Sequence, residues 1–266
     1  MIFTDTTTLA PQRFDQILDL VKARRAIRVE ELCGELSVSA ATIRRDLTEL
    51  DRRGYLRKVH GGAVTLAGGL AEAVFDDKTA EAAPEKLAIA HAARRFIQPN
   101  DCIFLDGGST VLALAHLLTD VHPLTVVTNS LRVAMTLSQA NPRLILVGGD
   151  LRRLSQTFVG PLTQSIIEQL HVDRAFMGTI GLTVTEGATT TDTAEAFTKR
   201  LVIQHATQVV LLADSSKFGK VAFAHAGNLD QFDILITDSK LESATERQFN
   251  RQGLELIKAP EIPEEE

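Results

Sequence analysis

The amino-acid sequence predicts a two-domain α/β protein, with a small helical domain at residues 11–64 and a larger doubly wound domain at 84–258. The first observation is a set of apolar residues at helical spacing near the N-terminus. The second is a series of short apolar runs that alternate with helical stretches from Pro84 onward. A chain of 266 residues is long enough for two such cores. Residues 65–83 have small side chains and no sustained period, so they form the predicted linker.

Three helices are predicted in the small domain. After Pro11, apolar residues from Phe14 to Val21 recur at the i, i+3, i+4, i+7 spacing of an amphipathic helix. A second helix is predicted at Val29–Leu36 and a third at 39–53. A tight turn of three residues separates the last two helices, and Ser39 is the predicted N-cap of the third.

A β-hairpin is predicted after the third helix, because residues 55–64 place a glycine pair between two short β-prone segments. Two helices joined by a tight turn and followed by a hairpin are typical of a winged helix-turn-helix. The N-terminal turn of the second helix in this motif enters the major groove, and the hairpin touches the flanking backbone. The residues expected to contact double-stranded DNA are Ser39, Ala40, Thr42, Arg44, Arg45, Arg57, Lys58 and His60.

The charge distribution agrees with this interpretation but decides little alone. Residues 11–60 hold 11 Lys and Arg against 8 Asp and Glu, whereas the whole chain has a net charge of -6. A basic end on an acidic body is typical of a DNA-binding module attached to another domain. The alternative is a three-helix interaction module in which Arg44 and Arg45 form a solvated face.

The larger domain contains six apolar runs that each end in Gly, Asn or Asp: CIFLDGG, LTVVTNS, LILVGGD, AFMGTIG, VVLLADS and ILITDS. Helices are predicted at 85–97, 111–118, 131–139, 162–170 and 195–205, and weaker strands at 172–176 and 254–258. Short apolar strands that alternate with helices indicate a mostly parallel sheet buried on both faces. In such sheets ligands bind outside the carboxyl ends of the strands.

The first of these strand ends suggests a phosphate site. Asp106, Gly107, Gly108, Ser109 and Thr110 connect a buried strand to a helix, where glycines allow close approach and the helix N-terminus offers free N–H groups. The alternative is that this sequence serves turn geometry and capping alone. Further candidates for binding the effector lie at other strand ends: Asn129, Ser130, Gly149, Asp192, Asp214 and Lys217.

Three of the polar residues near a later helix have equally ordinary explanations. Asp192 is a candidate N-cap as well as a ligand, Glu195 its capping-box partner, and Lys199 a solvated side chain. The segment GATTT at 187–191, which precedes them, is expected to be flexible.

Several classes of protein are disfavoured. The two cysteines, Cys33 and Cys102, have no CxxC spacing and are expected to be buried hydrophobes, so neither a metal nor a redox site is predicted. No apolar run approaches the ~20 residues that span a bilayer, and the N-terminus has no signal-peptide pattern. We expect a cytoplasmic protein without a cofactor.

The N-terminal motif resembles the signature of DeoR-family repressors. The matching residues are Thr42 through Leu47 (TIRRDL), followed by Gly54, Leu56 and the HGGA run that begins at His60. Lys58 departs from the arginine usual there, which keeps the charge but loses a bidentate contact. The body, at about 85–257, is similar to the DeoR-family sensor domain in FLDGGST, VVTNS, LVGG, VGP, VDRAFMG and LLADSSKFG. That domain is related to ribose-5-phosphate isomerase and coenzyme A transferase folds.

The resemblance implies a repressor of a sugar-metabolism operon that is released by a phosphorylated sugar. It implies that residues 107–110 hold phosphate and that Asn129, Asp192, Asp214 and Lys217 meet the rest of the sugar. A homo-oligomer, dimer or tetramer, is expected because operators are palindromic. One alternative is an active sugar-phosphate isomerase with a DNA-binding appendage, although no dense acidic cluster lies beside a glycine-rich lysine loop. A third possibility is an activator or architectural protein with an unliganded body.

Overall fold

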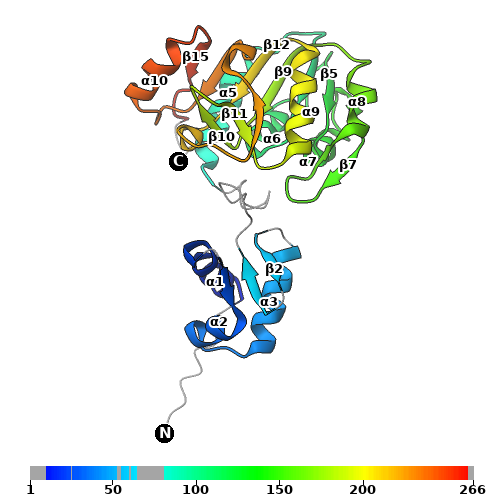
Figure 1. The fold of residues 1–266 in the computed structure, drawn as a ribbon. Helices are drawn as coiled ribbons and strands as arrows, with labels where there is room; N and C mark the ends of the chain where they lie inside the picture. Colours follow the sequence, from blue (N-terminus) through cyan, green and yellow to red (C-terminus); the bar gives the residue numbers. More distant parts are fainter. Residues whose placement is uncertain (1–9, 25, 53–54, 60, 65–80, 263–266) are drawn as a thin grey trace. The chain divides into compact units, whose positions relative to one another are not determined.

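The protein folds into two compact units in a computed structural model that describes residues 10–24, 26–52, 55–59, 61–64 and 81–262 (Figure 1). Described residues 10–64 belong to the first unit and 81–262 to the second. Most of the predicted linker, residues 65–80, lies outside the described residues, as do His60, Gly54 and the last four residues. None of the helices that the structure describes is long and apolar enough to cross a membrane.

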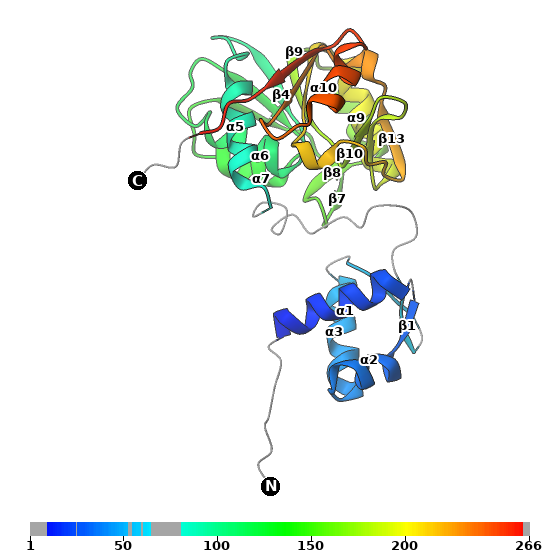
Figure 2. The same ribbon diagram turned by 90° about the vertical axis from the view of Figure 1, so that its left-hand side faces the viewer.

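The first unit packs three helices against a small antiparallel sheet (Figure 2). The helices are α1 (Ala10–Arg24), α2 (Val29–Leu36) and α3 (Ala40–Arg52), which agree closely with the predicted ranges. The strands β1 (Ala26–Arg28), β2 (Arg57–Val59) and β3 (Gly62–Val64) have the order β1-β3-β2. The core between them contains Ile17, Leu32, Ile43, Leu47, Leu50 and Leu56, each no more than 1% exposed.

Strand β1 was not predicted, because three residues are too few to show alternation. Its central residue Ile27 is 3% exposed and pairs with Ala63. Gly62 is required at this pairing, since a Cβ there would lie 2.3 Å from the carbonyl oxygen of Ile27. The third strand therefore turns the predicted hairpin into a sheet that covers the helices.

The second unit is built on a seven-stranded parallel sheet with the order β15-β14-β12-β9-β4-β5-β6. Every strand comes from a segment that the sequence predicted, including the two weaker ones. The bounds are β4 (Cys102–Leu105), β5 (Thr125–Thr128), β6 (Arg143–Leu146), β9 (Val172–Gly178), β12 (Ala206–Leu212), β14 (Ile234–Thr237) and β15 (Glu255–Lys258).

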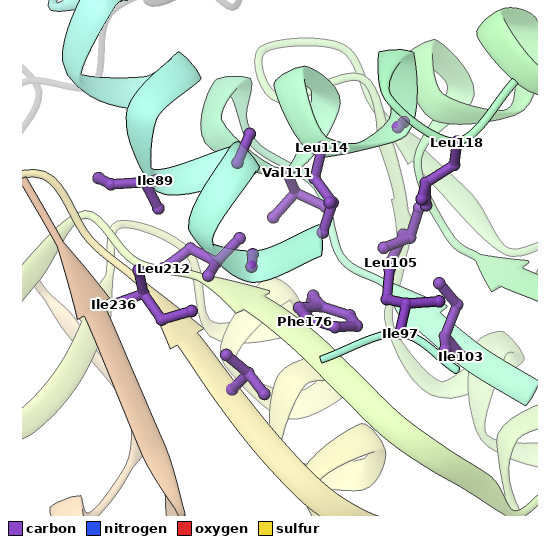
Figure 3. Packing of buried hydrophobic residues seen from close by; sticks show 14 of the residues in the cluster. Ile89, Ile97, Ile103, Leu105, Val111, Leu114, Leu118, Phe176, Leu212 and Ile236 are labelled. Carbon is purple, nitrogen blue, oxygen red and sulfur yellow. The ribbon is translucent and has the colours of Figure 1, made fainter. Parts of the chain in front are cut away.

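Helices cover both faces of this sheet because its side chains alternate between two cores. Ile103 and Leu105 face a core with α5 (Ala83–Arg94), α6 (Ser109–His116) and α7 (Leu131–Leu137), which Figure 3 shows. Phe104 faces the other core, with α8 (Pro161–Ile167), α9 (Thr193–Gln204) and α10 (Ser243–Asn250). Helix α5 begins at Ala83, inside the predicted linker, and α10 was not predicted.

Two small antiparallel sheets complete the second unit. One has the order β10-β11-β13, from β10 (Gly181–Thr183), β11 (Gly187–Thr190) and β13 (Ala224–Gly227). The other is a hairpin of β7 (Asp150–Arg152) and β8 (Thr157–Val159). Two 3-10 helices, η1 (Ser215–Lys217) and η2 (Leu229–Gln231), follow β12 and β13.

Two sequence-based expectations are wrong. The segment at 187–191 was expected to be flexible, but its first four residues form β11 and are all buried, because they pair on both sides. Cys33 and Cys102 are free thiols as expected, but both are only half-buried rather than buried. Each lies at the edge of a core, with solvent on one side.

Candidate functional site

The start of α3 is held by a serine cap. Ser39 Oγ accepts a hydrogen bond from the Thr42 N–H at 3.2 Å and lies 2.9 Å from Thr42 Oγ1. The preceding helix α2 ends at Leu36, and its C-cap Ser37 adopts a left-handed conformation with a φ of 54°. The predicted N-cap is therefore confirmed. It leaves the first turn of α3 free to approach a ligand.

The outer side of α3 carries the candidate DNA-contact residues. Arg44 and Arg45 are exposed, while Ile43, on the side of α3 that faces the core, is fully buried. Ser39 is exposed, and Ala40 and Thr42 are half-exposed. Small side chains at the helix start and two cations one turn later form a surface that fits a major groove.

The hairpin adds cations to this surface, but one of them is tied to α3. Arg57 and Lys58 are exposed on β2. Lys58 Nζ donates to Thr48 Oγ1 at 2.6 Å, and the Lys58 N–H donates to Asp51 Oδ1 at 3.1 Å. Lys58 thus also fixes the hairpin against the helix, a role that the sequence did not predict. His60 lies outside the described residues.

A buried ion pair connects the helix that carries Arg44 to α1. Arg13 Nε donates to Asp46 Oδ2 at 2.6 Å, and Arg13 Nη2 donates to Asp46 Oδ1 at 3.2 Å. The hydrogen bond to Asp46 raises the pKa of Arg13 above its already high value. Asp46 belongs to the TIRRDL motif, so part of this motif is structural.

In the second unit the predicted strand ends meet at one edge of the sheet. Strands β4, β5 and β6 follow each other in one direction, whereas β9, β12, β14 and β15 lie on the other side of β4. The order reverses between β4 and β9, and such a switch point opens a ligand crevice beyond the strand ends. The turn that follows β4, residues 106–110, lies at this point and is called the glycine turn below.

The two glycines of the glycine turn have different roles. A Cβ at Gly107 would come 2.1 Å from Thr157 Cγ2, so this glycine makes room for the β7–β8 hairpin. A Cβ at Gly108 would meet nothing within 4 Å, and its φ of +125° favours glycine. Ser109 and Thr110 then begin α6. The open side at Gly108 leaves space beside the N–H groups of this first helical turn, and helix N-termini of this kind favour anions.

Asn129 and Ser130 directly follow the neighbouring strand β5, whose last residue, Thr128, pairs with Leu105 just before the glycine turn. Ser130 Oγ caps α7 by accepting from the Val133 N–H at 3.3 Å. Asn129 Nδ2 donates to the Phe158 carbonyl at 3.0 Å. Asn129 is 2% exposed, and its Oδ1 has no hydrogen-bond partner among the described residues. A buried acceptor in this state favours a ligand that supplies a donor.

Five charged side chains of alternating sign run from the glycine turn to the start of α9. We call them the charge chain: Asp106, Lys199, Glu195, Arg152 and Asp192. Lys199 Nζ is ion-paired with Asp106, donates to the Gly178 carbonyl at 3.0 Å and lies 3.7 Å from Glu195 Oε1. Arg152 lies 3.4 Å from Glu195 and 3.6 Å from Asp192.

The charge chain shows the roles of two side chains for which the sequence left alternatives, Lys199 and Asp192. A solvated side chain was one of the two explanations for Lys199, but Lys199 is 4% exposed and is ion-paired with the Asp106 carboxylate just after β4. Asp192 does cap α9, with Oδ1 accepting from the Glu195 N–H at 2.9 Å, while its other oxygen faces Arg152. Arg152 was not predicted at all. The i, i+4 spacing of Glu195 and Lys199 was the available signal.

Two other predicted groups lie apart from the glycine turn. Asp214 and Lys217 are 3.7 Å apart at the end of β12, two strands from β4 and so about 10 Å away. Among the described residues, no hydrogen bond or ion pair joins them to the turn. Gly149 makes room for α8, since a Cβ there would come 2.8 Å from Thr163 Cγ2.

Two family models match this chain. The DeoR-like helix-turn-helix domain matches residues 13–67, and the DeoR C-terminal sensor domain matches residues 81–239. Together they cover most of both folded units.

Curated relatives match over nearly the whole chain. An uncharacterized transcriptional regulator of Bacillus subtilis, YulB, is 36% identical and covers 95% of this chain and 98% of its own. The regulator GlpR of Haloferax volcanii is 34% identical, with 94% and 98% covered. The lactose phosphotransferase system repressor of Streptococcus mutans is 36% identical, with 85% and 91% covered.

Solved structures match more distantly. Ribose 5-phosphate isomerase A of Methanocaldococcus jannaschii is 19% identical, with a TM-score of 0.38, and the match covers 50% of this chain and 53% of that one.

Proposed function

The chain belongs to the DeoR family of transcription regulators, and on that premise we propose that it is a sugar-responsive repressor. Its first unit binds operator DNA, and its second unit binds a phosphorylated sugar at the glycine turn. Sugar binding lowers the affinity for DNA and releases the operon. The protein acts in the cytoplasm, where the DNA lies, and needs no cofactor.

The proposal for DNA rests on the exposed cations around the start of α3. Arg44, Arg45 and Arg57 are exposed on one small unit whose own core is complete without them. An arginine on a recognition helix reads guanine through two hydrogen bonds, and neighbouring cations pair with phosphates. Thr42, two residues before Arg44, is suited to a thymine methyl group or a phosphate.

The assignment of a sugar phosphate rests on two different groups that lie at the switch point, one suited to a phosphate and one suited to a hydroxyl. The open side of Gly108 and the first turn of α6 suit the phosphate, because these N–H groups and the helix dipole favour an anion. The buried Oδ1 of Asn129, on the next strand, suits a hydroxyl that donates to it. A polyol phosphate offers both groups on one small molecule. The name of the lactose phosphotransferase system repressor supports a sugar-linked effector.

The test is a DNA-binding titration with the full chain and its operator. Sugar phosphates, the parent sugars and inorganic phosphate are added separately, and DNA affinity is followed by fluorescence anisotropy. We expect a sugar phosphate to weaken DNA binding by 5–150-fold, the usual range of allosteric coupling, estimated as about 1–3 kcal/mol. If only an unphosphorylated sugar changes the affinity, the phosphate assignment is wrong.

Two variants separate binding of the effector from binding of DNA. Ser109→Ala and Asn129→Ala should retain the affinity for the operator but require more sugar phosphate for release. Ser165→Ala is the matched control, because Ser165 is exposed on α8. Loss of DNA binding by Ser109→Ala would contradict a separate sensing site.

Catalysis is the alternative that needs its own test. Isomerisation requires a carboxylate base beside the substrate. Asp106 in the glycine turn and Glu195 of the charge chain are both ion-paired with Lys199. We therefore propose that the second unit binds its ligand without converting it. Interconversion of pentose or hexose phosphates by the pure protein, followed by NMR, would contradict this.

A further inference from the structure

A cavity of about 620 Å³ opens in the second unit beyond the ends of β12 and β14, and we call it the α10 cavity. Three segments line it: the turn between β10 and β11, η1 with the two residues that follow it, and the stretch from Lys240 to Phe249. Figures 1 and 2 show α10 and β10 on the same side of this unit. Among the described residues that line the cavity, none belongs to the glycine turn or to the charge chain. Its volume is within the range of small-molecule sites.

The lining of the α10 cavity carries many hydroxyl groups. Its uncharged polar side chains are Thr183, Thr185, Ser215, Ser216, Thr245 and Gln248. Two of them are used internally: Ser216 donates to Asp214, and Thr183 accepts from the Glu186 N–H at 3.0 Å. The other four side chains make no hydrogen bond to any described residue. They therefore offer donors and acceptors to a bound molecule.

One wall of the α10 cavity is aromatic. The ring of Phe218 packs edge-to-face on the ring of Phe249, with centroids 5.0 Å apart. Phe249 is 2% exposed, whereas Phe218 is half-buried, so Phe218 presents more of its surface to the cavity. Val184 and Leu241 add further apolar surface. An apolar wall opposite hydroxyl groups suits a ligand that has both C–H faces and O–H edges.

The α10 cavity has no surplus of positive charge. Lys240 and Glu242 are the two charged residues among the described residues that line it. The Lys240 ammonium is already ion-paired with Glu85, which does not line the cavity. The exposed Glu242 precedes α10 and supplies a negative charge where a helix dipole favours an anion. A phosphate would therefore meet an opposing carboxylate and a cation that is already paired, whereas an uncharged ligand avoids this repulsion.

We propose that the α10 cavity binds an uncharged sugar or polyol, at a site separate from the glycine turn. The hydroxyl groups of such a molecule both donate and accept, which matches the Ser, Thr and Gln side chains around it. Its C–H face packs on Phe218. The absence of a phosphate distinguishes this ligand from the effector proposed above.

One short element connects the α10 cavity to two predicted effector residues. Ser215 and Ser216 of η1 line the cavity, while Asp214 and Lys217 lie 3.7 Å apart in the same turn. Because the Ser216 hydroxyl donates to Asp214, a ligand that engages Ser216 changes the hydrogen bonding of that carboxylate. An uncharged sugar in the cavity is thus placed to adjust the response to the effector. This consequence, unlike the site itself, rests on the proposed function.

The test uses the full chain without DNA and four uncharged probes: ribose, glucose, galactose and sorbitol. Saturation-transfer NMR detects weak binding of each probe. We expect at least one of them to bind with a dissociation constant at or below about 10 mM. Gln248→Ala should weaken this binding about two- to tenfold, the cost of one hydrogen bond. Gln252→Ala is the matched control, because Gln252 is exposed after α10 and does not line the cavity.

A blocking variant and a competitor locate the bound probe. Thr185→Trp places a large ring at the cavity and should abolish binding, while circular dichroism should match the wild type because Thr185 is exposed in a turn. Excess inorganic phosphate, which is directed to the glycine turn, should leave the probe bound. Failure of all four probes to bind, binding that survives Thr185→Trp, or displacement by phosphate would overturn the proposal. Because no DNA or sugar phosphate is used, failure here leaves the proposed function standing.

Discussion

In the first unit, the arginines assigned to DNA contact are exposed, and the buried ion pair of Arg13 and Asp46 only holds their helix in place. In the second unit more than half of the assigned groups are themselves buried, and several are paired with one another. Arg44 and Arg45 are exposed on the surface of α3 with Asp46 buried beneath them, whereas Asp106 and Asn129, which follow β4 and β5, are each 2% exposed.

This difference separates two ways of binding. A rigid exposed surface suits a large partner such as a duplex, which brings its own shape and charge. A buried polar crevice suits a small ligand that replaces internal hydrogen bonds, so binding there also changes the protein. In the first unit, replacing a ligand-contact residue should therefore change the affinity for DNA but not the free energy of unfolding. In the second unit, replacing one should change both the affinity for the effector and the free energy of unfolding.

The largest effect is expected from Lys199→Met. This change leaves Asp106 and Glu195 buried without their shared cation, which should destabilise the second unit by about 3–5 kcal/mol. Urea denaturation followed by circular dichroism measures it. Lys220→Met, at an exposed residue, is the control. A change below about 1 kcal/mol would show that the charge chain contributes little.

Asp46→Ala should destabilise the first unit, by at most the amount expected for Lys199→Met in the second. It removes the carboxylate to which buried Arg13 donates two hydrogen bonds, at a cost of about 3–5 kcal/mol. The chain has a single tyrosine, Tyr55 in the first unit, and no tryptophan, so tyrosine fluorescence follows this unit alone. Asp19→Ala, at an exposed residue of α1, should unfold like the wild type. Joint replacement, Arg13→Met with Asp46→Leu, should recover most of the stability; a further loss would contradict the pairing argument.

Arg44→Ala should weaken operator binding by about 1–3 kcal/mol if the guanidinium reads a guanine. The stability of the first unit should not change, because Arg44 is exposed. Arg247→Ala, on the exposed side of α10, is the control. Equal losses on operator and random DNA would assign Arg44 to phosphate contact instead.

The smallest effect concerns the thiol of Cys102. Burial raises its pKa, so less of the reactive thiolate is present at pH 7.5 than for an ordinary cysteine. In a Cys33→Ser variant, alkylation by iodoacetamide should be slower than for free cysteine and should rise with pH beyond pH 9. A rate equal to that of free cysteine would place this thiol outside the core.

The local elements could be predicted because each depends on neighbouring residues. The apolar spacing of α1, the Ser39 cap and the parallel strands are all confirmed. The failures concern partners far apart in the chain. β1 forms only because β3 lies beside it, and Lys199 is buried only because Asp106, 93 residues earlier, neutralises it.

The sequence by itself determined the two-unit organisation, the helix-turn-helix, the glycine turn and its place at a strand end. Local periodicity and turn chemistry decide these features. The tertiary structure decided which polar groups meet: it paired Arg13 with Asp46, assembled the charge chain and placed Thr157 against Gly107. Such contacts depend on the strand order, which brings β4 beside β9 and is not written in any single segment.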